Sequence, residues 1–297
     1  MITDPRAEGE ALGSSSFGWF DLAWPWIGLG FAVVLGILLA TNLLRGDRAM
    51  PRWRDLRWLS FLAVVVYLVH NVEEYGISAT GVVHAFPDSL CGLLGQPDYP
   101  GCGIPPVFYL AVNLPLVWVA GPLAAALSRR FPLAGLTLWG VIGVNAIVHI
   151  VPAIARQEYD PGLLTAVVLF VPFTGMVAVA VMRPRGSYRK RAGLVLLAAG
   201  LLMHAVLAGS ALLFLQGAIP EWLLLVAQPG AIAGGYLLVA VNDRELRPGA
   251  VEWRGDVVYT PGLSPRRRVG CFRVGPGRVH RRSACAVTHS TAHLPRR

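Results

Sequence analysis

Long apolar runs separated by short polar segments dominate this 297-residue sequence. A membrane-spanning helix needs about 20 mostly apolar residues, and seven runs reach that length. The pattern therefore predicts an all-α, polytopic transmembrane helix bundle within residues 19–241. The expected spans cover about residues 19–44, 58–76, 104–127, 131–153, 162–182, 192–216 and 221–241.

The composition supports this class. Hydrophobic residues make up 55% of the chain and charged residues 14%, whereas a soluble globular domain carries about 25% charged residues. The mean hydropathy of +0.55 agrees. The first ten residues are acidic, and no short apolar core with a small-residue cleavage site follows them, so we expect no cleavable signal peptide.

Basic residues alternate between the loops. Arginines gather after the first span, between the third and fourth spans, and between the fifth and sixth, whereas the other loops are nearly free of Lys and Arg. The positive-inside rule then predicts that residues 1–18 lie outside and the C-terminus inside. Arg accounts for 25 of the 26 basic residues, which suggests a GC-rich bacterial genome and hence the cell membrane.

The C-terminal segment, residues 242–297, differs in composition from the bundle. It holds 12 basic and 4 acidic residues, a net charge of +8 out of +9 for the whole chain. Many Gly, Pro and Arg residues without apolar periodicity predict a disordered cytoplasmic tail. The tail could contact anionic lipid, at about 1 kcal/mol per basic residue, or be solvated without a specific role. No sequence motif indicates nucleic-acid binding.

Two cysteines lie in the long loop that is predicted to be outside. Cys91 and Cys102 could form a disulfide there, because an extracytoplasmic compartment permits one. Two free thiols fit the sequence equally well.

The second span ends in the polar stretch HNVEEY, residues 70–75. An ionised group inside a bilayer costs at least a few kcal/mol unless it has partners. His70 lies 13 residues beyond Arg57, or roughly 20 Å along a helix. Glu73 and Glu74 follow at positions i+3 and i+4, so we expect one polar patch in the outer half of the membrane.

The fourth span and the loop after it hold a second polar set. His149 and Asn145 are four residues apart and share a helix face. We expect the span to end near Pro152, because proline removes a helix hydrogen bond. Tyr159 follows at the same predicted side. His204 lies at the depth of His70, and we interpret it as a structural residue.

These residues resemble a known family. HNVEE at 70–74, the separate His149 in NAIVHI and YDPG at 159–162 match the HxxEE motif, further histidine and YxPG motif of the HXXEE-domain membrane proteins. The resemblance covers about residues 58–180. It implies no reaction, since the family is of unknown function. The motifs and the predicted depth in the membrane nevertheless select the same residues.

The polar set suggests a metal site. Two imidazoles and a carboxylate commonly hold Zn²⁺ or non-haem iron. We expect His70 and His149 as ligands with one of the two glutamates, and assign Glu73 to the metal and Glu74 to the general base. Tyr159 would stabilise an oxyanion, and Asn145 would orient His149.

Such a site would belong to a metal-dependent membrane enzyme. A zinc-bound water would favour hydrolysis of a lipid or lipid-linked substrate at the outer leaflet, and iron would favour oxidation. Two other functions fit the sequence. A proton-coupled transporter would use the same His and Glu residues, with a path continuing past His204 and Gln228. A structural or accessory membrane protein would use them only to tie helices together.

Overall fold

The computed structural model of the protein describes residues 18–182, 188 and 190–246. Seven helical segments among them are long and apolar enough to cross a membrane, which confirms the predicted fold class: Trp19–Ala40, Leu56–Gly76, Pro106–Leu127, Pro132–Arg156, Leu163–Met182, Arg191–Leu215 and Glu221–Asn242. The described residues contain no β-strand. The orientation of the termini stays a prediction, and most of the predicted tail and N-terminal segment lies outside the described residues.

The fourth span is longer than predicted. It continues through Pro152 to Arg156, and Gln157 ends it in the left-handed conformation. The expectation of an end near Pro152 was wrong. A proline in the last two turns removes only one helix hydrogen bond. The helix continues beyond it, and Ala153 still accepts a hydrogen bond from the amide of Glu158.

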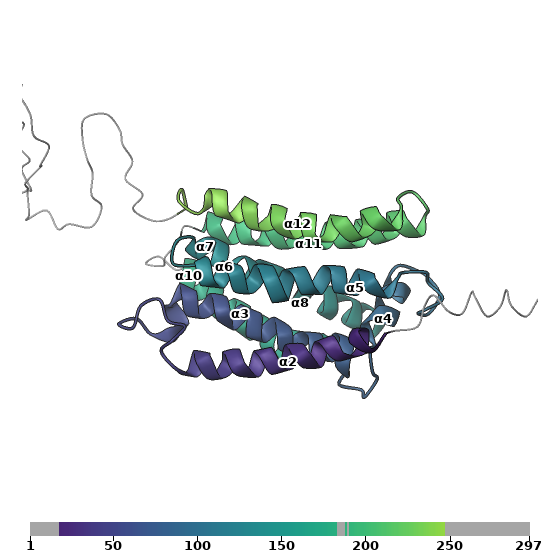
Figure 1. Ribbon diagram of the computed structural model, residues 1–297, viewed down its shortest axis with the longest axis horizontal. Helices are drawn as coiled ribbons and strands as arrows, with labels where there is room; N and C mark the ends of the chain where they lie inside the picture. Colours follow the sequence, from purple (N-terminus) through teal and green to yellow (C-terminus); the bar gives the residue numbers. More distant parts are fainter. Residues whose placement is uncertain (1–17, 183–187, 189, 247–297) are drawn as a thin grey trace, which may run out of the picture. The chain divides into compact units, whose positions relative to one another are not determined.

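Several spans consist of more than one helical element (Figure 1). Short π-helical segments at Val72–Gly76, Leu114–Ala120 and Ala166–Phe170 lie within the second, third and fifth spans. The α-helices are α2 (Trp19–Ala40), α3 (Leu56–Asn71), α4 (Phe86–Leu93), α5 (Pro106–Asn113), α6 (Gly121–Leu127), α7 (Pro132–Gly135), α8 (Thr137–Arg156), α9 (Leu163–Thr165), α10 (Val171–Met182), α11 (Arg191–Leu215) and α12 (Glu221–Asn242).

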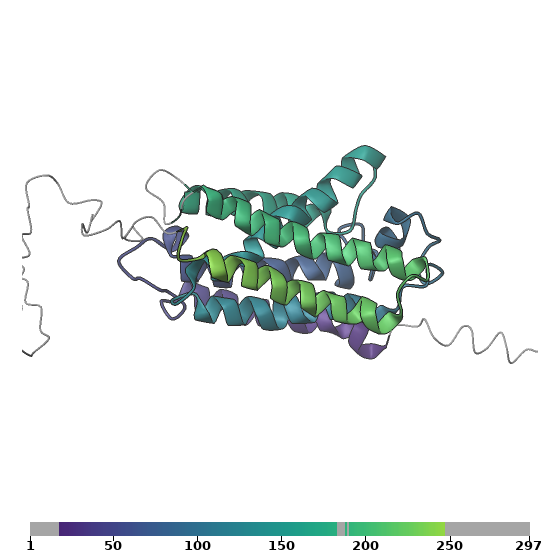
Figure 2. The ribbon, with the colours of Figure 1, turned by 90° about the horizontal axis from the view of Figure 1, so that it is seen from above.

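Two spans form the centre of the bundle. The helices run side by side along its length (Figures 1 and 2). The protein buries 67% of the most apolar stretch of the second span and 56% of that of the fourth. The corresponding share is 28% in each of the other five spans. These two central spans carry the HNVEE stretch and His149. Their polar side chains are therefore enclosed by protein rather than by lipid, the arrangement that makes intramembrane charge tolerable.

Helices α8 and α11 cross with their backbones in contact. A Cβ atom added to Gly140 would lie 2.0 Å from the carbonyl oxygen of Leu196, and one added to Gly200 would lie 2.3 Å from the carbonyl oxygen of Gly140. Small residues allow this approach, as they do in many membrane bundles. The crossing brings His204 of α11 to the polar face of α8.

The loop between α3 and α5 folds back onto the end of the bundle. It contains α4, whose Cys91 forms a disulfide with Cys102, one of the two states that the sequence allowed. His84 is buried in this loop and bonds through Nδ1 to the carbonyl oxygen of Tyr75 at 2.9 Å. The loop thereby covers the polar residues at the end of α3.

The α8–α11 crossing predicts which glycine the fold requires. Gly140→Ala should lower the free energy of unfolding by about 1–3 kcal/mol, because the added methyl group forces two backbones apart. Gly143→Ala on the same helix is the matched control, since its Cβ would meet only Thr174 Cγ2 at 3.4 Å. Thermal unfolding in detergent measures both, and equal melting temperatures would contradict this role of the crossing.

Candidate metal centre

The HNVEE stretch ends α3 in a turn of π-helix. The amide of Ile77 donates to the carbonyl oxygen of Val72 at 2.7 Å, five residues back. Such turns reorient side chains and are frequent at functional sites. Here Glu74 turns toward His70, while Glu73 points to the start of the fifth span.

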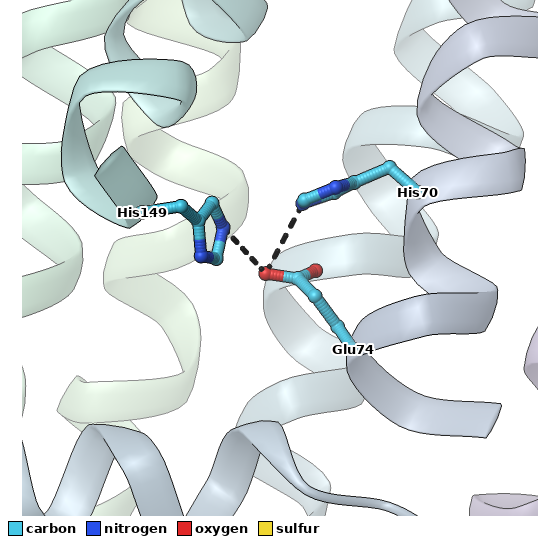
Figure 3. A group of neighbouring side chains, drawn as sticks. All are labelled: His70, Glu74 and His149. Carbon is cyan, nitrogen blue, oxygen red and sulfur yellow. Dashed lines mark ion pairs between the residues drawn. The ribbon is translucent and has the colours of Figure 1, made fainter. Parts of the chain in front are cut away.

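Three side chains from the two central spans meet at one point. Glu74 Oε1 lies 3.3 Å from His70 Nε2 and 3.2 Å from His149 Nε2. Figure 3 shows the Glu74 carboxylate between the two imidazoles. Both histidines are 0% exposed and Glu74 is 3% exposed. One ligand atom from each of the three residues lies within 4.8 Å of the others, so this cluster could hold a metal ion.

The far nitrogen of each imidazole is held by a hydrogen bond. His149 Nδ1 lies 2.6 Å from Asp160 Oδ2, an acceptor, so Nδ1 carries a proton. His70 Nδ1 lies 2.7 Å from Thr165 Oγ1, whose own proton goes to Glu73 Oε2, so Nδ1 of His70 is again the donor. In the neutral imidazoles both Nε2 atoms then carry a lone pair.

Asp160 was not anticipated as a site residue. It occupies the variable position of the YDPG motif and lies eleven residues beyond its partner His149. Ser89 of α4 donates to its other oxygen at 2.6 Å and so fixes the carboxylate. A carboxylate behind a metal-binding histidine is a common way to set its tautomer and ring orientation. Only the path of the loop after α8 brings this pair together.

Glu73 has a different position from the one expected. It accepts bonds from the backbone amides of Leu164 and Thr165 at 2.9 and 2.7 Å, and from the hydroxyls of Thr165 and Tyr159. It therefore satisfies free amides at the start of the fifth span. The structure places Glu74, not Glu73, with the two histidines, so the roles assigned to the two glutamates do not agree with the geometry.

Tyr159 belongs to the Glu73 contact and not to the His–Glu cluster. Its hydroxyl donates to Glu73 and accepts from the amide of Ala79 at 3.2 Å. Burial and the bond to the carboxylate raise the pKa of the Tyr159 phenol well above its ordinary range. The phenol stays a neutral donor, but it is already engaged, so the expected role at an oxyanion has no support in this geometry.

Gly162 of the YDPG motif lies against both imidazoles. Its φ of +102° favours glycine, and a Cβ atom there would lie 2.7 Å from His149 Cε1 and 2.8 Å from His70 Cε1. The motif therefore does three things: Tyr159 bonds Glu73, Asp160 bonds His149, and Gly162 leaves space for the two rings.

Asn145 contacts His70 rather than His149, its expected partner. Its Nδ2 lies 3.1 Å from His70 Nε2, and its Oδ1 lies 3.4 Å from His204 Nε2. His204 also bonds the carbonyl oxygen of Gly200 through Nδ1 at 2.9 Å, which agrees with a structural role while joining it to the network. Asn145 of α8 thus connects the His–Glu cluster to α11.

A cavity of about 460 Å³, which we call the bundle cavity, reaches the cluster. It lies between α4, α5, α8 and α11, and Glu74, Asn145 and His204 line its polar end. Leu90, Val112, Leu207 and similar residues line the rest. A molecule in this cavity would meet Glu74 directly, whereas Glu73 does not line it.

The two glutamates should differ in their effect on stability. Glu73→Gln places an amide where four donors converge and should lower the free energy of unfolding by about 1–3 kcal/mol. Glu74→Gln should be neutral or stabilising in chelator-treated protein, because its amide can donate to an imidazole lone pair. Thermal unfolding tests both, with the exposed Glu158→Gln as control. Equal losses for Glu73→Gln and Glu74→Gln would contradict the placement of the glutamates.

The comparison with known families agrees with the resemblance in the motifs. Residues 61–177 match a family described as "Protein of unknown function with HXXEE motif". No curated protein and no solved structure matches the chain. The matched segment contains the His–Glu cluster, Asp160 and Gly162. Residues 61–177 of this membrane protein are therefore similar to the HXXEE-motif family, whose function is unknown.

Proposed function

We propose that this protein is a metal-dependent membrane enzyme. His70, His149 and Glu74 would bind a divalent cation, Zn²⁺ or Fe²⁺, and the bundle cavity would admit a lipid or lipid-linked substrate. One observation carries the proposal. The Nε2 atoms of two imidazoles lie 3.3 and 3.2 Å from one carboxylate oxygen in a buried site, and the outer nitrogen of each ring is held by a hydrogen bond.

The distances from the Glu74 oxygen to the two imidazole nitrogens suit a small cation. Ligands at about 2.0–2.1 Å from a tetrahedral metal lie roughly 3.3 Å apart, and Glu74 Oε1 lies 3.3 and 3.2 Å from the two Nε2 atoms. These are long distances for a charge-assisted hydrogen bond. Among the residues that the structure describes, none is a hydrogen-bond partner of His149 Nε2.

The charges favour a divalent ion. Glu74 and Asp160 together bring two negative charges to a site that protein encloses, and an uncompensated buried charge costs several kcal/mol. One divalent cation would balance the charge of both carboxylates. Asp160 would also hold the His149 ring in place and increase its basicity as a ligand.

The metal decides the reaction class. Bound zinc lowers the pKa of a coordinated water toward about 7 and favours hydrolysis, and non-haem iron held by two histidines and one carboxylate favours oxidation. Glu73 is occupied by its four donors, so in a hydrolase the cation itself would activate the water. The assignment of Glu74 as a separate general base is not retained.

A proton-coupled transporter is the second candidate. The observation that favours it is the continuous chain of titratable and hydroxyl groups from Glu73 through Thr165, His70, Glu74 and His149 to Asp160. The expected continuation through Gln228 is weaker, because its amide nitrogen donates to Ser210 and to the carbonyl oxygen of Leu224 within the α11–α12 pair.

Metal content separates these functions. We expect near-stoichiometric zinc or iron in full-length protein that was purified in detergent without chelator, and a loss of at least 80% in His70→Ala, His149→Ala and Glu74→Ala. Elemental mass spectrometry measures it. His84→Ala is the matched control, a buried histidine outside the cluster. Folded protein without metal would overturn the enzyme proposal and leave the proton relay.

Asp160 should act through His149. Asp160→Asn keeps the size of the side chain but removes its charge, and should weaken metal affinity about 10–100-fold, as loss of a partner behind a ligating histidine does. Competition with a fluorescent zinc chelator measures the change. Glu158→Asn, an exposed carboxylate two residues away, should leave the affinity unchanged. Equal affinities in the two variants would exclude this role of Asp160.

A further inference from the structure

The bundle cavity is open toward the lipid. Leu93, Ile147 and Leu201 line it and are 45%, 57% and 52% exposed. Ile147 and Leu201 belong to membrane-spanning helices, so the surface that they expose faces hydrocarbon in a bilayer. An apolar chain can therefore enter the bundle cavity sideways without passing through water.

A second cavity lies next to the bundle cavity, among the loops that follow α3 and α8. This loop cavity has a volume of about 620 Å³. Three carboxylates line it in addition to Asp160, namely Asp88, Asp98 and Glu158, against one guanidinium, Arg156. Burial lowers the pKa of His84, which also lines it, so this imidazole is neutral at pH 7. The loop cavity carries an excess of negative charge.

The two cavities meet at the proposed metal centre. Ser89, Pro152 and Asp160 line both of them. Asp160 bonds His149 on one side and Ser89 on the other. A molecule that crosses from the charged cavity to the apolar one therefore passes Asp160 and reaches Glu74.

The size of the bundle cavity limits its contents. About 460 Å³ holds on the order of fifteen groups the size of a water molecule, at ~30 Å³ each. A methylene group has nearly that volume, so one hydrocarbon chain of about fifteen carbons fills the cavity.

We infer that the substrate is a single-chain amphiphile with a head group that is not anionic. Its chain occupies the bundle cavity, its head occupies the loop cavity, and the bond between them lies at the His–Glu cluster. An anionic head would meet the carboxylates of the loop cavity, and like charges there disfavour it. This inference rests on the proposed function for the reaction, but the binding of the amphiphile does not require metal.

The test uses full-length protein in phosphatidylcholine nanodiscs. Radiolabelled 1-monopalmitoylglycerol is the neutral probe and hexadecyl phosphate the anionic one, each measured by scintillation proximity against empty nanodiscs. We expect saturable binding of the monoglyceride, and at least tenfold weaker binding of the phosphate. Ala208→Phe, which fills the bundle cavity, should weaken monoglyceride binding at least tenfold. Ala178→Phe lines a separate apolar cavity on α10 and is the matched control, with unchanged binding.

Three results would overturn the inference: no saturable monoglyceride binding, equal binding of the two probes, or equal loss in Ala208→Phe and Ala178→Phe. The comparison of the two probes needs no variant, so it decides the head-group assignment even where Ala208→Phe does not fold. Metal content is measured on the same samples. Saturable monoglyceride binding in metal-free protein would refute the proposed enzyme and leave the amphiphile site intact.

Discussion

The structure depends on how the central helices accommodate buried negative charge. Glu73 and Glu74 lie at the end of the most buried span, and Asp160 lies close by. Each carboxylate needs compensation that lipid cannot provide. Glu73 obtains it from four donors, Asp160 from Ser89 and His149, and Glu74 only from two imidazoles. This difference in partners distinguishes Glu73, a structural residue, from Glu74, the proposed metal ligand.

The same requirement explains the arrangement of the fifth span. Its first amides need acceptors, because a helix start leaves unpaired N–H groups. Glu73 supplies them from α3, and Thr165 of that span returns a contact to His70. The end of α3 and the start of the fifth span therefore hold one another, and His70 is fixed through Thr165, which does not line the bundle cavity.

Access to the cluster follows from the packing of the other helices. Helices α8 and α11 are in backbone contact at Gly140 and Gly200, and the bundle cavity lies on the C-terminal side of these glycines, where Ile147 and Leu201 are exposed. The loop with α4 covers this region from above, and its disulfide joins Cys91 of α4 to Cys102. Backbone contact at the glycines and open space beyond them give the proposed site both a fixed ligand set and an entrance for a long chain.

The sequence by itself determined the seven spans and the candidate residues, because bilayer thickness fixes the length of an apolar helix and because polar residues inside such a helix are rare. It placed His70, both glutamates and His149 near a common depth. Only the tertiary structure decided which glutamate meets the histidines, because a π-turn changes the direction of side chains without changing the sequence spacing. It also decided the partners of Asp160, Asn145 and Tyr159. Those contacts depend on how loops and neighbouring helices fold back, and hydrophobic periodicity carries no information about that.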